Sequence, residues 1–105
     1  MNKRVVITGM GTINPLGDNL EDFYTNLING KSGVKRWESI DLRDVECKVG
    51  GDIGDYNWKA ALERLEPDLT PDMYKRTKKL FKNTTFSARI AVLSALTAYK
   101  HAGLF

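Results

Sequence analysis

The sequence predicts an α/β protein, because one apolar block has the composition of a β-strand and two longer segments have the spacing of helices. Val5, Val6 and Ile7 are consecutive β-branched residues, which is typical of a strand buried on both faces of a sheet. Near residues 20–28 and 86–102, apolar side chains recur every three or four positions. A doubly buried strand needs neighbours that the rest of the chain does not obviously supply. We therefore expect a piece of a larger fold.

The first helix follows a turn. Asn14-Pro15-Leu16-Gly17 predicts this turn, because Pro fixes one backbone dihedral and Gly relaxes another. Asp18, with Glu21 three residues later, predicts a capping box. One apolar helical stripe then comprises Leu20, Phe23, Tyr24, Leu27 and Ile28. Gly30 is expected to end the helix.

The middle of the chain is predicted to be mostly loop. Residues 31–45 read as a connection, and the alternation of Val45-Glu46-Cys47-Lys48-Val49 predicts a short strand that continues to Ile53. Asn57 is a candidate cap for a short helix through Leu65, which Pro67 would end.

The C-terminal third is predicted to be helical. Thr70-Pro71 is a start signal for a helix that runs to about Lys82, and residues 83–85 interrupt it or cap the next one. The last helix, through Ala102, has one face formed by Phe86, Ile90, Leu93 and Leu96. An adjacent row of small side chains comprises Ala88, Ala91, Ala95, Ala98 and Ala102. Such a row allows another backbone to come close, so we expect this helix to be buried between neighbours.

Composition limits the class of protein. Hydrophobic residues make up 42% of the chain and charged residues 28%, which is typical of a soluble globular protein. No apolar run approaches the roughly 20 residues that span a membrane, and no secretory leader is recognised. The single cysteine excludes an internal disulfide and favours a cytoplasmic location. A net charge of +3 permits an acidic partner without requiring nucleic acid.

The residues that often carry chemistry do not form a recognisable active site. Gly9-x-Gly11 lacks the third glycine of a dinucleotide-binding fingerprint, because position 14 is Asn, so we interpret these glycines as serving a tight turn and close packing. Cys47 lies in the predicted strand and is interpreted as structural. His101 lies in the last helical turn, where the helix dipole favours its cationic form. No metal-ligand spacing occurs, and neither a metal nor a cofactor is expected.

The strongest charge signal is a basic cluster without any acidic residue inside it. It comprises Lys75, Arg76, Lys78, Lys79 and Lys82. Like charges this close repel one another, so the cluster is either a binding surface or an ordinary solvated face. A small basic module that binds nucleic acid is an alternative of another class. Against it, the cluster is short and no aromatic residues are interleaved with it.

Several motifs, in order, resemble the N-terminus of β-ketoacyl-acyl-carrier-protein synthases, the condensing enzymes of fatty-acid and polyketide synthesis. The first is Arg4-Val5-Val6-Ile7-Thr8-Gly9-Met10-Gly11, followed by Pro15-Leu16-Gly17. A Gly-Lys-Ser-Gly-hydrophobic segment (30–34), a strand ending at Gly51 and an Ala-rich helix closing in Ala102-Gly103-Leu104 continue the match. The resemblance spans nearly all 105 residues but only the opening portion of the family.

The resemblance implies that residues 1–105 are the incomplete N-terminal portion of a thiolase-like, five-layered αβαβα fold. It implies decarboxylative condensation of an acyl thioester with malonyl-acyl-carrier-protein. The nucleophilic cysteine and the catalytic histidines and lysine are expected beyond residue 105, so this segment alone is expected to be inactive. Expected partners are acyl carrier protein, the remainder of the synthase chain and a second copy in a homodimer, with no nucleic acid or membrane.

The resemblance also gives the basic cluster a role. In the family, basic residues just before the Ala-rich helix dock the acidic helix of acyl carrier protein, and Lys79 and Lys82 fall on that segment. Lys75, Arg76 and Lys78 extend it. One departure keeps an alternative open: the usual Arg-Met-Asp-Arg-Phe type sequence is here Lys82-Asn83-Thr84-Thr85-Phe86. A non-catalytic subunit resembling a chain-length factor, which would form a heterodimer, fits that departure.

Overall fold

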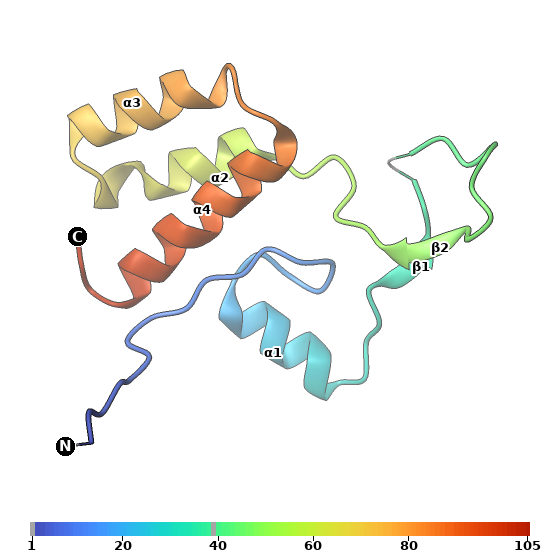
Figure 1. Ribbon diagram of the computed structural model, residues 1–105, viewed down its shortest axis with the longest axis horizontal. Helices are drawn as coiled ribbons and strands as arrows, with labels where there is room; N and C mark the ends of the chain where they lie inside the picture. The colour runs from blue at the N-terminus through green and yellow to red at the C-terminus, as the bar shows by residue number, and fades with distance from the viewer. Residues whose placement is uncertain (1, 39) are drawn as a thin grey trace. The chain divides into compact units, whose positions relative to one another are not determined.

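A computed structural model describes residues 2–38 and 40–105 of the chain (Figure 1). The chain divides into two compact units: a hairpin unit, residues 12–57, and a helical unit, which joins residues 2–11 to residues 58–105. The elements are α1 (Leu20–Ile28), β1 (Val34–Arg36), β2 (Val49–Gly51), α2 (Trp58–Leu65), the short 3-10 helix η1 (Glu66–Asp68), α3 (Pro71–Phe81) and α4 (Phe86–His101). The described part is therefore α/β, as predicted. None of the helices in it combines the length and the hydropathy that a membrane crossing requires.

The prediction of a buried first strand is wrong for this chain. Val5, Val6 and Ile7 are 93%, 70% and 82% exposed and belong to no strand. The physical reason is the absence of hydrogen-bonding neighbours, since the one sheet in the described residues pairs β1 with β2 alone. A segment with the composition of a strand does not form one unless a neighbouring strand is present to share its backbone hydrogen bonds.

In the hairpin unit, the predicted turn and helix form, but the cap differs from the prediction. Residues 14 and 17 of the turn exchange two backbone hydrogen bonds of 3.0 Å. The N-cap of α1 is Asn19, whose Oδ1 accepts from the backbone N–H of Asp22 at 2.8 Å. Asp18 instead accepts a hydrogen bond of 2.8 Å from the Tyr56 hydroxyl, which takes it away from the helix end. Gly30 follows the helix with φ +72°, a conformation that favours glycine.

The sheet of the hairpin unit corrects two expectations. β1 lies inside the predicted loop (of which Ser39 is outside the described residues), and β2 covers only part of the predicted strand of residues 45–53. The two pair antiparallel with Val34 opposite Gly51. Backbone pairing with β1, rather than the alternation of apolar and polar residues, therefore decides where β2 begins and ends. Gly50 is required there, because a Cβ would lie 2.1 Å from the Trp37 ring.

The helices of the helical unit follow the predicted signals closely. α2 ends at Leu65, and Pro67 falls in η1, which turns the chain toward α3. The hydroxyl of Thr70 accepts from the backbone N–H of Met73 at 3.2 Å and caps α3. Thr85 caps α4 in the same way, so residues 83–85 both separate α3 from α4 and provide the N-cap of α4. Figure 1 shows α2 and α3 running in opposite directions along one another, with α4 against α2.

The buried apolar residues of the described chain all lie in this helical unit. They are Ala61, Leu62, Leu65, Leu69, Phe81 and Leu93. Phe81 is 0% exposed and packs edge-on against Trp58 of α2, with ring centroids 5.6 Å apart. The end of α3 is therefore fixed to the start of α2.

The small-residue row of α4 has the predicted neighbour, although the helix is not buried on all sides. Residues 9–11 run along α4 so closely that a Cβ on Gly9 would lie 2.4 Å from the Ala98 carbonyl oxygen, and one on Gly11 would lie 2.3 Å from that of Ser94. Close packing is thus the role of these glycines. Ala91 and Ala95, by contrast, are exposed. The expected burial between several neighbours is therefore wrong for this chain, because Leu93 is the one buried residue of α4.

Candidate functional site

The basic cluster lies on one helix of the helical unit. Lys75 and Arg76 lie in the middle of α3, Lys78 and Lys79 lie in its last turn, and Lys82 is the residue at its C-cap. All five side chains are exposed. Cations in the last turn of a helix are favoured by the partial negative charge of its carbonyl end, which offsets part of their mutual repulsion.

The five cations are not equivalent. The Arg76 Nε lies 3.0 Å from an Asp72 carboxylate oxygen one turn earlier, an exposed pair worth little in stability but sufficient to neutralise that charge locally. The Lys78 ammonium lies 5.9 Å from the centre of the Tyr74 ring. Within residues 2–38 and 40–105, no carboxylate lies within ion-pair distance of Lys78 or Lys82. Within the same residues the same holds for Lys75 and Lys79, so four lysines of the cluster keep their charge to offer a partner.

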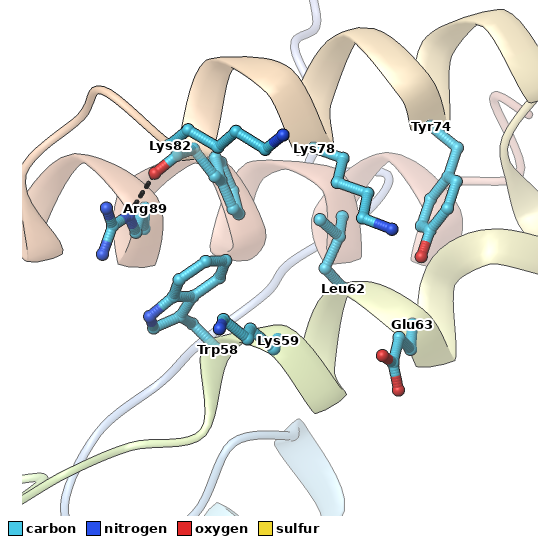
Figure 2. A pocket seen from close by; sticks show the side chains of 9 residues that line it. Trp58, Lys59, Leu62, Glu63, Tyr74, Lys78, Lys82 and Arg89 are labelled. Atoms are coloured by element: carbon cyan, nitrogen blue, oxygen red, sulfur yellow. Dashed lines mark hydrogen bonds between the residues drawn. The ribbon is translucent and has the colours of Figure 1, made fainter.

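Lys78 and Lys82 share a hollow, which we call the Trp58 hollow. Its volume is about 490 Å³, within the usual range of ligand pockets. Its lining residues are Trp58, Lys59, Leu62, Glu63, Tyr74, Lys78, Phe81, Lys82 and Arg89 (Figure 2). Four of these nine side chains are cationic and one is anionic. Lys75, Arg76 and Lys79 are not among them, so the structure divides the predicted cluster into lining and outlying members.

Arg89 is the residue of this site that sequence reasoning missed. It reaches from α4 to the end of α3, where its Nε donates to the Phe81 carbonyl oxygen at 2.7 Å (dashed in Figure 2). The guanidinium carbon lies 4.4 Å from the centre of the Trp58 ring, a cation–π contact. The available signal was a lone cation in the first turn of an Ala-rich helix, where the helix dipole disfavours positive charge.

Neither Cys47 nor His101 is among the residues that line this hollow. Cys47 is exposed, lies just before β2 rather than in it, and donates its S–H to the Val49 carbonyl oxygen at 3.2 Å. The backbone N–H of Met10 donates to His101 Nδ1 at 2.9 Å. This hydrogen bond fastens residues 9–11 to the last turn of α4.

Comparison with known proteins decides the family. The sequence pattern of the family described as beta-ketoacyl synthase, N-terminal domain, matches residues 2–105. The chain belongs to this family. The exposure of Val5 to Ile7 does not overturn that assignment, because it rests on the sequence match over residues 2–105.

Curated relatives agree with the family. The chain is 38% identical over 64 residues to 3-oxoacyl-[acyl-carrier-protein] synthase 2 of Synechocystis, covering 61% of this chain and 15% of the relative. It is 30% identical over 102 residues to the protein of that name from Coxiella burnetii, covering 97% of this chain and 21% of the relative. The chloroplastic synthase II of Arabidopsis thaliana is 36% identical over 55 residues, 52% of this chain and 10% of its own. No solved structure matches.

This ketoacyl synthase segment thus spans about a fifth or less of the length of the relatives it matches. The family match also bears on Gly9 and Gly11. They belong to the motif that resembles the synthases, and the structure places both against the backbone of α4.

Within the described residues, no three His, Cys, Asp or Glu side chains are grouped as metal ligands.

Proposed function

We propose that the protein carrying this segment is a condensing enzyme that extends acyl thioesters with malonyl-acyl-carrier-protein. In this reaction an acyl group held as a thioester on an enzyme cysteine is attacked by the malonyl C2 carbon. Carbon dioxide leaves as the new carbon–carbon bond forms, and the cysteine thiolate is released. The observation that supports the proposal is the family match over residues 2–105, together with relatives named 3-oxoacyl-[acyl-carrier-protein] synthase 2.

We assign this segment scaffold and docking roles rather than catalysis. Neither Cys47 nor His101 has the surroundings of a catalytic group, since one contacts a carbonyl oxygen and the other a backbone N–H. The nucleophile would then lie outside these residues, and the 105-residue chain alone is proposed to be inactive. The thiolase-like layers, the cytoplasmic location and a homodimer belong to the same proposal.

Condensing activity is tested with the full-length protein, an acylated carrier and malonyl-acyl-carrier-protein, with release of carbon dioxide as the readout. Condensation without any other synthase supports the proposal. A full-length protein that is inactive alone but required by a partner synthase would instead favour the non-catalytic subunit, which the departure at residues 82–86 keeps as an alternative.

The docking role is proposed for the basic cluster of α3. Carrier proteins present an acidic helix, and a basic helix face attracts such a partner through long-range electrostatics. Lys79→Glu with Lys82→Glu should raise KM for acyl carrier protein at low salt, with kcat unchanged. The rise should shrink as salt screens the charges. An unchanged KM would remove the docking role. A gel shift with duplex DNA at matched salt tests the nucleic-acid alternative.

A further inference from the structure

We propose that the Trp58 hollow is the anchoring point for the acidic partner. Carboxylates of the partner bind Lys78, Lys82 and Arg89, and an apolar side chain beside them enters the hollow. The partner it fits is an acidic amphipathic helix that carries one large apolar residue. This inference rests on the proposed carrier docking and deepens it, because it replaces a diffuse basic face by a defined site.

Charge is the first argument for an anionic occupant. The lining contains the cations of Lys59, Lys78, Lys82 and Arg89 against the single carboxylate of Glu63. Figure 2 shows that this carboxylate points away from α3. A hollow lined this way favours a partner that brings its own carboxylates.

Preorganisation of Arg89 is the second argument. Its Nε donates to the Phe81 carbonyl oxygen, and its guanidinium carbon lies over the Trp58 ring. A guanidinium fixed in this way loses little side-chain freedom when its remaining N–H groups bind a carboxylate. Arg89 is also only partly exposed, whereas Lys78 and Lys82 are exposed, so a bond to Arg89 is less screened by water.

The floor of the hollow is the third argument. Leu62 and Phe81 are 2% and 0% exposed and form a rigid apolar base, and Trp58 is half-buried beside them. The Trp58 ring already contacts the Arg89 guanidinium, the Lys59 ammonium at 5.5 Å and the edge of Phe81. These contacts cover most of the surface of the Trp58 ring. A nucleic-acid base would therefore have little ring surface to stack on, and an aliphatic side chain of the partner with carboxylates beside it fits better.

The test compares two charge-matched double variants of the full-length protein. Lys78→Glu with Lys82→Glu changes two lining residues, and Lys75→Glu with Lys79→Glu changes two outlying residues of the same helix by the same charge. Binding of acyl carrier protein is measured by calorimetry at about 0.15 M salt, where the Debye length is about 8 Å. We expect Kd to rise at least about tenfold for the lining pair and less than about threefold for the outlying pair.

Trp58 supplies a second readout. Its emission should change when acyl carrier protein binds the unaltered protein, and the change should be absent in Trp58→Phe, which keeps an aromatic ring there. Circular dichroism of each variant checks that the helices are retained. An emission change in Trp58→Phe equal to that of the unaltered protein would overturn the hollow as the anchor.

The two proposals fail differently. Equal losses of affinity for the lining and outlying pairs overturn the anchoring site and leave carrier docking in place. If neither pair weakens binding, carrier docking itself fails, and the anchoring site fails with it. A larger loss for the outlying pair also overturns the anchoring site.

Discussion

Replacing Gly11 by Ala should detach residues 9–11 from α4. The added methyl carbon would lie 2.3 Å from the Ser94 carbonyl oxygen and 2.9 Å from the Ala98 nitrogen, and both neighbours are backbone atoms of a helix. Since a helix backbone yields little, the extended segment must move. Overpacking of this kind costs about 1–3 kcal/mol. That cost corresponds to a roughly 5- to 150-fold larger population of the detached state.

The Met10 amide reports this detachment directly. Its N–H donates to His101 Nδ1 at 2.9 Å, so it exchanges with solvent only when the segment leaves α4. Hydrogen exchange of the full-length protein should show the Met10 amide exchanging about 5- to 150-fold faster in Gly11→Ala. Amides in the middle of α4 should be much less affected, because their bonds lie within the helix.

Gly30→Ala provides the control. Its φ of +72° strains an alanine, yet a Cβ there would have no atom within 4 Å, and Gly30 belongs to the hairpin unit. It should leave Met10 exchange unchanged. Equal Met10 exchange rates in Gly11→Ala and the unaltered protein would refute the close packing of this glycine on α4.

Two further predictions concern stability and titration. Phe81→Ala should lower the free energy of unfolding by about 3–5 kcal/mol in denaturant titrations, whereas Leu80→Ala, at a side chain 53% exposed, should cost less than about 1 kcal/mol; similar losses would contradict the assigned core. Hydrogen bonds from the Arg43 side chain and, to a smaller extent, from its backbone N–H lower the pKa of Asp41 below its ordinary value. The stability that they add is complete above the pKa of Asp41 in the unfolded chain, and it is lost as the pH falls through the pKa in the folded chain. In Arg43→Gln the titration midpoint of Asp41, followed by NMR, should move upward toward the ordinary value, and an unmoved midpoint would exclude Arg43 as the cause.

Local signals determined the helices of this protein well. Thr70-Pro71 and Thr85 start α3 and α4 where the sequence places them, because a cap needs only a hydroxyl and an N–H three residues away. The same locality explains the error at Asp18. Asp18 accepts a hydrogen bond from Tyr56, which is far along the chain, and the neighbouring Asn19 caps the helix instead.

The order of the motifs also determined the family, and the family match over residues 2–105 confirmed it. The charge of α3 was equally visible, since a count of lysines requires no structure. What the sequence could not provide was the division of that charge. Arg76 pairs with Asp72, Lys78 and Lys82 line the Trp58 hollow, and Arg89 joins them from another helix.

The sequence by itself determined which segments are helical, where α3 and α4 start, and which family the chain belongs to, because those properties depend on neighbours within one or two turns or on the order of motifs. Only the tertiary structure decided that Val5 to Ile7 lack strand partners and that Gly9 and Gly11 lie on α4. It also decided that Arg89 faces Trp58. Each of these depends on residues distant in the chain, whose approach no local pattern encodes.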